Sequence, residues 1–92
     1  MHKKILDQIK DKVRNHEFII TNHAFEEMIA DDLSVYDIEL GILSGELIER
    51  QKNEFEWKYV IKGRTSSNEA VFVITKISIT DKVIVVTVFL DW

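Results

Sequence analysis

The sequence predicts an α+β domain in which three N-terminal helices pack on a curved antiparallel sheet of about four strands. Three observations predict this fold class. Apolar residues recur every three or four positions in the first half of the chain and every two positions in the second. No proline and no linker of low complexity separates the halves. The 92 residues are therefore expected to form one domain, 1–92, in which 1–16 is an N-terminal helix.

The first helix is predicted from an apolar stripe near the start of the chain. The stripe consists of Ile5, Leu6, Ile9 and Val13. Lysines and aspartates fill the positions between these residues, as expected for a helix that places one face on a core. A short extended run over residues 18–20 follows.

Two further helices are predicted before Gly45, which is a natural helix stop. Thr21 or Asn22 can cap the first of them. Its apolar stripe is predicted to consist of Ala24, Phe25, Met28 and Ile29. Ser34 is expected to cap the second, and Asp37 completes an approximate capping box. The buried side of this last helix is predicted to carry Val35, Ile38 and Ile42.

After Gly45 the apolar residues alternate with polar ones, which predicts strands. A short strand is expected over residues 46–51. In the next strand, the alternating sets are Trp57, Tyr59 and Ile61 against Lys58, Val60 and Lys62. The runs 71–74 and 83–90 are apolar on both faces, which is typical of central strands. Polar turns are predicted at 63–68 and 80–82.

The apolar character of both faces of the last two strands leaves two alternatives. The helices can cover only one face of the sheet. Either the sheet curls around its own core, or its second face meets another chain, for example in a homodimer.

The charge is unevenly distributed along the chain, although the net formal charge is only −4. Residues 1–14 carry five bases and two acids, and residues 50–92 carry seven bases and five acids. Residues 15–49 carry nine acids and no Lys or Arg. This distribution excludes a wholly basic nucleic-acid-binding surface. It predicts one acidic side and one mildly basic side.

Several classes of protein are excluded by composition. Cysteine is absent, which excludes disulfides, thiolate metal sites and a cysteine nucleophile. No apolar run approaches the ~20 residues that a membrane span requires. Acidic residues also follow the start of the chain too soon for a secretory signal. We therefore expect a cytoplasmic protein with no membrane partner.

His23 is the candidate for catalysis. It is predicted in the first turn of a helix, and an imidazole can act as a general acid or base near neutral pH. The alternative is a structural histidine, hydrogen-bonded to a neighbouring strand or cap. Glu26 and Glu27 lie at helical spacing from His23, but one histidine with carboxylates is a poor transition-metal site. We expect no metal and no cofactor, and a solvated helix face explains these acids.

Lys58, Lys62 and Arg64 are the candidates for phosphate binding. By strand alternation Lys58 and Lys62 share one face, and Trp57 and Tyr59 share the other. An exposed Trp57 or Tyr59 can stack on a base. In the alternative interpretation both aromatic residues belong to the core, and the lysines form a soluble strand edge.

Several short motifs, taken in their order along the chain, resemble those of a known family. The motifs are Phe-Ile-Ile-Thr, a His-Ala pair that opens a helix, a Met one turn later, a Leu-Ser helix start, Ser-Gly-Glu-Leu-Ile-Glu, Lys-Tyr-Val-Ile-Lys-Gly and Val-Ile-Val-Val-Thr-Val-Phe. Together they resemble a family of small uncharacterised bacterial and archaeal domains related to BrnT and, more distantly, to RelE-type toxins. The resemblance covers about residues 18–90, within a family-like core of 17–92.

The resemblance implies a RelE-like fold and a toxin-type endoribonuclease, similar to an mRNA interferase, that is held by an antitoxin. Genes of the family often lie beside genes for YgiT-type zinc-finger antitoxins. No metal or cofactor is implied. His23 is then the proton-transfer residue, and Lys58, Lys62 and Arg64 contact RNA. The alternative is a non-catalytic protein-interaction module or a degenerate toxin of the same fold.

Two positions depart from the pattern of this family. Its members usually have Arg just before the Met and again before the Leu-Ser step, where this chain has Glu27 and Asp32. Because phosphates are bound by Lys and Arg, no phosphate contact is expected at either position. The acids of the predicted helices serve solubility or attract a basic partner, such as an antitoxin segment.

Overall fold

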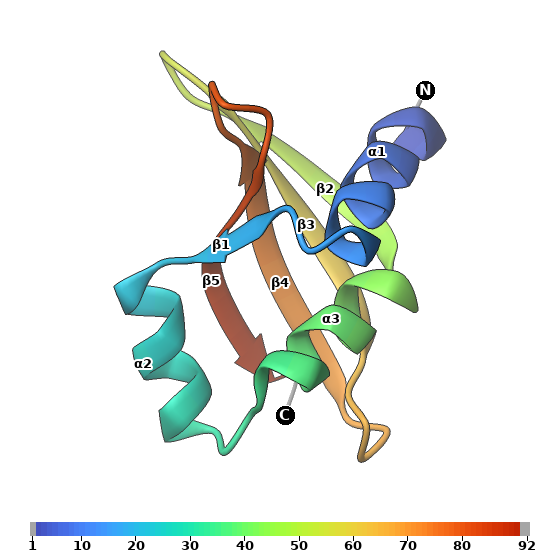
Figure 1. Ribbon diagram of the computed structural model, residues 1–92, viewed down its shortest axis with the longest axis vertical. Coiled ribbons are helices and arrows are strands. Elements are labelled where there is room, and N and C mark those ends of the chain that lie inside the picture. The colour runs from blue at the N-terminus through green and yellow to red at the C-terminus, as the bar shows by residue number, and fades with distance from the viewer. Residues whose placement is uncertain (1, 91–92) are drawn as a thin grey trace.

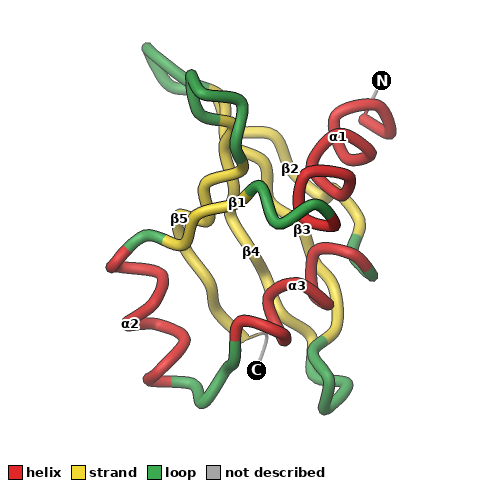
Figure 2. Tube along the Cα trace, viewed as in Figure 1, coloured by secondary structure: helices red, strands yellow, loops and turns green. Residues whose placement is uncertain are grey.

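A computed structural model describes residues 2–90 as three helices and a five-stranded sheet. The helices are α1 (His2–Arg14), α2 (Asn22–Ala30) and α3 (Val35–Leu43). The strands are β1 (Phe18–Ile20), β2 (Glu46–Lys52), β3 (Trp57–Arg64), β4 (Ala70–Ile77) and β5 (Val83–Leu90). Figure 1 shows the helices on one side of a single twisted sheet. In Figure 2 the loops gather at the two ends of the strands.

The sheet has the strand order β1-β5-β4-β3-β2. Strands β2 to β5 form an antiparallel meander, as the sequence predicts. The prediction of about four antiparallel strands is nevertheless incomplete, because β1 joins the sheet as a fifth strand, parallel to β5 with Phe18 opposite Val83. The sheet is therefore mixed. The sequence of β1 predicts an extended conformation, but three residues are too few to predict which strand it pairs with.

The predicted helix starts are confirmed. Thr21 caps α2, and its Oγ1 accepts a hydrogen bond from the Ala24 N–H at 3.1 Å. Ser34 caps α3 in a complete capping box with Asp37. The end of α3 lies at Leu43, with Ser44 as its C-cap, just before the glycine that predicts a stop.

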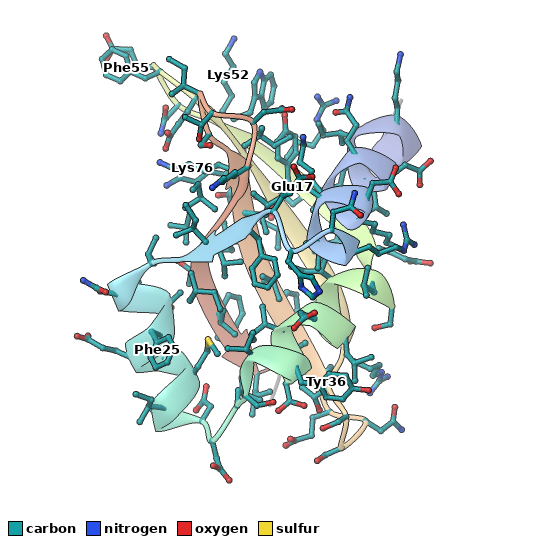
Figure 3. All side chains as sticks on the ribbon, viewed as in Figure 1. Glu17, Phe25, Tyr36, Lys52, Phe55 and Lys76 are labelled. Carbon is teal, nitrogen blue, oxygen red and sulfur yellow. The ribbon has the colours of Figure 1, made fainter. Side chains whose placement is uncertain are left out.

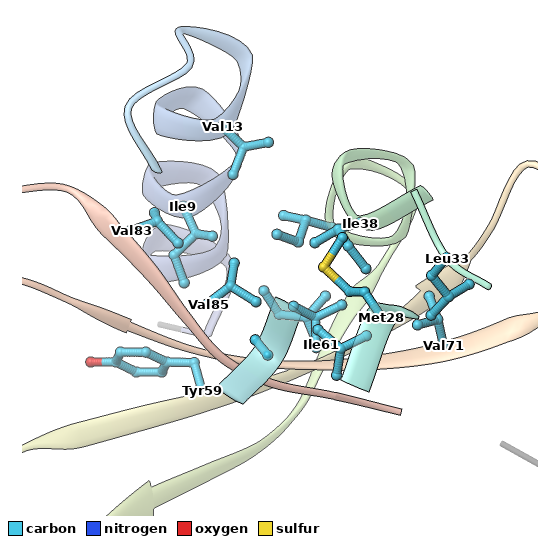
Figure 4. Packing of buried hydrophobic residues seen from close by; sticks show 14 of the residues in the cluster. Ile9, Val13, Met28, Leu33, Ile38, Tyr59, Ile61, Val71, Val83 and Val85 are labelled. Carbon is cyan, nitrogen blue, oxygen red and sulfur yellow. The ribbon is translucent and has the colours of Figure 1, made fainter. Parts of the chain in front are cut away.

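The hydrophobic core lies between the helices and one face of the sheet (Figure 4). The fully buried helix residues include Ile9, Val13, Met28, Ile38 and Ile42. The fully buried strand residues include Ile61, Val71, Val73, Val83, Val85 and Val88. The predicted stripe of α1 is therefore on the core side, with Ile5 and Leu6 partly buried at its margin.

Three apolar residues that were predicted to face the core lie at the surface instead. On α2, Phe25 is 48% exposed and Ile29 is 68% exposed, whereas Met28 is buried. Val35 at the start of α3 is also exposed. The reason on α2 is its position, because this helix packs chiefly on the single strand β5. A helix on one strand buries a narrower stripe than a helix that crosses several strands.

Helix α3 approaches the backbone of β3 very closely. A Cβ atom on Gly63 of β3 would lie only 1.8 Å from the carbonyl oxygen of Gly41 in α3. One turn further on, a Cβ atom on Gly45 would lie 2.6 Å from Ile61 Cγ2. The hydroxyl of Ser44 also accepts a hydrogen bond from the Arg64 N–H at 3.0 Å. Glycine is thus required where the two backbones meet.

Asp37 joins the start of α3 to the turn between β3 and β4. Its Oδ2 accepts hydrogen bonds from the N–H and the hydroxyl of Ser34, both at 3.0 Å. Its Oδ1 accepts hydrogen bonds from the N–H and hydroxyl of Ser66, at 2.9 and 2.6 Å. The Ser34 N–H and then the Ser66 donors stabilise the carboxylate and lower the pKa of Asp37 to about 2.

We predict that Gly63→Ala destabilises the protein by about 3 kcal/mol or more, because the new Cβ meets the Gly41 carbonyl and forces two backbones apart. Gly41→Ala is the matched control. Its Cβ would meet side chains and no backbone, namely Val71 Cγ1 at 2.7 Å and Val73 Cγ2 at 3.7 Å, and alanine favours the helix by about 1 kcal/mol. Urea unfolding measures both free energies. Equal losses for the two variants would contradict the close contact of the backbones.

We predict that Asp37→Asn lowers the free energy of unfolding by about 2 kcal/mol at neutral pH. The amide NH2 group replaces one carboxylate oxygen, and each of these oxygens accepts hydrogen bonds from the N–H and the hydroxyl of one serine, Ser34 or Ser66. The folded-state pKa of Asp37 lies below its ordinary value, so its stabilisation is fully present above about pH 4 and is lost as the pH falls toward about 2. The difference between variant and wild type should therefore shrink over this interval. Urea unfolding at several pH values tests this, with exposed Asp7→Asn as control. A difference that does not change with pH would contradict it.

Candidate functional site

One face of the sheet carries no helix in the described part of the chain, because all three helices lie on the other side (Figure 1). We call this surface the open face. Its side chains alternate with the core residues along the three inner strands. They are Lys58, Val60, Lys62 and Arg64 of β3, Ala70, Phe72, Ile74 and Lys76 of β4, and Ile84, Val86, Thr87 and Phe89 of β5.

The apolar residues of the open face cover one another only in part. Val60 is buried although no helix lies above it, and Phe72 and Ile74 beside it are half-buried. Phe89 of β5 is 41% exposed, and Ile19 of β1 is 47% exposed. The open face is therefore an apolar surface with an accessible margin.

A cation and two aromatic rings form a row across the open face. Lys62 of β3 is opposite Phe72 of β4, and Phe72 is opposite Phe89 of β5. The Lys62 Nζ lies 5.2 Å from the centroid of the Phe72 ring. The Phe72 and Phe89 rings are stacked, with centroids 4.8 Å apart and planes 9° from parallel. We call these three residues the transverse row.

The three residues predicted to bind RNA share the open face. Lys58, Lys62 and Arg64 alternate along β3, which keeps a regular register with β4. The Arg64 guanidinium also donates to the Asn68 carbonyl oxygen at 3.2 Å, so the following turn positions it. Lys76 of β4 adds a fourth base and forms an ion pair with the Glu56 carboxylate of 3.0 Å.

Trp57 and Tyr59 lie on the opposite face of β3 from Lys58 and Lys62, as their alternation predicts. Tyr59 is buried, and the Arg50 guanidinium lies 5.0 Å from the Trp57 ring and 5.8 Å from the Tyr59 ring. The aromatic rings beside the lysines are instead those of the transverse row. Alternation in the last strands could have indicated Phe72 and Phe89, but the register that stacks them is not visible in the sequence.

His23 lies in the first turn of α2, beside the edge of β5. Its side chain is 68% exposed, and its Nε2 lies 3.5 Å from the Glu27 Oε1. The same Glu27 oxygen accepts a hydrogen bond from the Val88 N–H at 3.0 Å. Val88 immediately precedes Phe89. His23 is therefore connected through Glu27 to the edge of β5, and the predicted RNA-binding residues on β3 are two strands away from β5.

An irregularity in β5 explains why α2 lies at this edge. The β4–β5 register shifts at Val86, which has no partner in β4. The Val86 carbonyl accepts a hydrogen bond from the Thr21 hydroxyl at 3.3 Å, and Glu27 accepts from Val88. Since β1 pairs only with the first part of β5, α2 supplies the partners for the remainder of the edge.

The two acids that depart from the pattern of the resembled family, Glu27 and Asp32, both have structural roles. Glu27 is the acceptor for a strand N–H, which an arginine cannot replace. Asp32 follows α2 with a left-handed φ of 56°. Around it, the Asp32 N–H donates to the Ile29 carbonyl at 3.2 Å and the Leu33 N–H to the Met28 carbonyl at 2.8 Å. This is a Schellman motif, which ends the helix.

A polar hollow of about 270 Å³ lies between α1 and the loop after β4. It is lined by Gln8, Asp11, Lys12, Asn15, Glu17 and Asp81. Lys12 and Asp81 form an ion pair of 2.8 Å there. Among residues 2–90, no group of three or more His, Asp or Glu is arranged to hold a metal ion.

Residues 20–90 match the model of a family described as a domain of unknown function, DUF4258. This match spans well over half of the 92 residues. The chain belongs to the DUF4258 family. Membership confirms the predicted uncharacterised domain family, and the match includes His23, Lys58, Lys62 and Arg64. Neither a curated protein nor a solved structure matches the chain. Within residues 2–90 of this DUF4258 domain, no helix has the length and apolar character to cross a bilayer.

We predict that Glu27→Ala destabilises this DUF4258 domain by about 1–2 kcal/mol, because the Val88 N–H loses its acceptor. Glu26→Ala is the matched control, since Glu26 is exposed and adjacent, and it should change stability by less than about 0.5 kcal/mol. Urea unfolding measures both, and hydrogen exchange at Val88 should accelerate only in the Glu27 variant. Unchanged exchange at Val88 would contradict the assigned bond.

Proposed function

We propose that this DUF4258 domain binds single-stranded RNA across its open face, as expected of a RelE/BrnT-like toxin. The transverse row carries the proposal. Stacked rings beside a cation can hold an unpaired base on Phe89 while Lys62 attracts the adjoining phosphate. Lys58, Arg64 and Lys76 extend the positive charge of the same face.

A single strand fits the open face better than a duplex. Stacking on a protein ring requires a base that is not already stacked in a helix. The distance from β3 to β5 is also only about 10 Å, since neighbouring strands lie about 4.8 Å apart, so the row accommodates one or two nucleotides. Helices α2 and α3 lie on the helix side of the sheet (Figure 1), and of their acids Glu27 lies at the β5 edge, beside His23.

In the full form of the proposal the domain is a toxin-type endoribonuclease with His23 as the proton-transfer residue. A strand that follows the row from Lys62 over Phe89 reaches the β5 edge, where the exposed His23 is held beside Glu27. An imidazole there can accept the proton of a ribose 2′-hydroxyl or protonate the leaving 5′-oxygen. Cleavage, an antitoxin partner and kinship with BrnT and RelE rest on the sequence resemblance. A degenerate toxin that binds RNA without cleaving it is the alternative.

We predict micromolar binding of a fluorescein-labelled oligouridylate, measured by fluorescence anisotropy. Phe89→Ala should weaken binding about tenfold, because base stacking contributes ~1–3 kcal/mol. Lys62→Ala should reduce the salt dependence by about one phosphate contact. Lys4→Ala is the matched control, since Lys4 is an exposed lysine on α1, and it should leave affinity unchanged.

The outcomes separate binding from cleavage. Cuts in a message incubated with the protein that vanish in His23→Ala would support the endoribonuclease. Bound but uncut RNA would support the degenerate toxin. Affinity that is insensitive to Phe89→Ala would contradict the open-face proposal. A dimer in solution that Phe89→Ala dissociates would assign the open face to a second copy instead.

A further inference from the structure

Helix α2 exposes two large apolar side chains on one side. Phe25 and Ile29 are four residues apart, so they lie one helical turn apart along the same side of the helix, and they are 48% and 68% exposed. Figure 3 shows Phe25 projecting from α2, and Tyr36 projecting from the start of α3. Adjacent exposed apolar residues on a short helix are typical of an interaction surface.

The surroundings of this apolar pair are acidic. The sequence has no Lys or Arg between Asn15 and Glu49, so neither α2 nor α3 carries a basic side chain of those types. Glu26 lies between Phe25 and Ile29 in the sequence and Asp32 follows them, and both acids are exposed, whereas Asp31 is half-buried. A ligand for this surface must therefore supply both apolar groups and positive charge.

We propose that Phe25 and Ile29 of α2 dock a basic amphipathic helix of a partner protein. A helix suits the site because its own hydrogen bonds satisfy its backbone. An extended segment would instead need a free strand edge, and α2 offers only side chains. The partner places apolar residues, three or four positions apart, between Phe25 and Ile29. Its flanking Lys or Arg residues face Glu26 and Asp32.

Charge also argues that the occupant is a different protein. In a symmetric dimer through α2, each copy would bring its acidic helix against the same acidic helix, and like charges across an interface are unfavourable. The length of α2, nine residues or about 13 Å, matches two to three turns of a partner helix. The site lies on the helix side of the sheet, so this proposal is independent of RNA binding on the open face.

The test uses a dye-labelled synthetic peptide of about 14 residues, four helical turns, with leucines along one side and lysines elsewhere. Fluorescence anisotropy should give a dissociation constant in the micromolar range. The double variant Phe25→Ser and Ile29→Ser should raise it at least tenfold, and it should remain folded because both side chains are exposed. Phe55→Ser, which removes an exposed phenylalanine from the loop between β2 and β3, is the matched control and should not change it.

Two further peptides identify the chemistry. A peptide of the same composition with its leucines distributed around the helix should bind at least tenfold more weakly. So should a peptide with glutamates in place of the lysines. Equal binding of the rearranged peptide would overturn the proposal, because attraction would then be electrostatic alone. It would also be overturned by wild-type affinity in the double serine variant, by no detectable binding, or by a wild-type dimer that this variant dissociates.

Discussion

The close contact between α3 and β3 governs the arrangement of this domain. Gly63 allows the Gly41 carbonyl to reach the strand backbone, and Asp37 fastens the start of the same helix to Ser66 after β3. A helix held this close packs Ile38 and Ile42 against the middle strands. The core on this side is completed by α1 and α2. No helix is left to cover the other face, and the open face is a direct consequence.

A second constraint is the edge of β5. Since β1 is only three residues long, it pairs with Val83 to Val85 and leaves the remainder of the edge unpaired. Thr21 and Glu27 supply the missing hydrogen bonds from α2. The same bonds place His23 beside the strand that carries Phe89. The short length of β1 thus explains both why α2 covers the edge of β5 and why His23 lies beside it. It also explains why position 27 is an acid.

The fold separates most of the acidic block from the lysines and the arginine of the open face. The acids between 15 and 49 lie largely on α2, α3 and the loop between them, whereas Lys58, Lys62, Arg64 and Lys76 lie on the open face. In the sequence the acids weigh against RNA binding. In the structure the acids of α2 and α3 belong to the helix side of the sheet, whereas Glu46 and Glu49 of β2 are opposite Lys62 and Val60 and share the open face with them.

The sequence by itself determined the helix starts at Thr21 and Ser34, the meander of the last four strands and the shared face of Lys58 and Lys62, because these follow from local capping and from alternation. The tertiary structure alone decided the partner of β1 and the exposure of Phe25 and Ile29. It also decided the stacking of Phe72 on Phe89. These depend on register and on how many strands a helix crosses, and such long-range geometry leaves no mark in the spacing of residues along the chain.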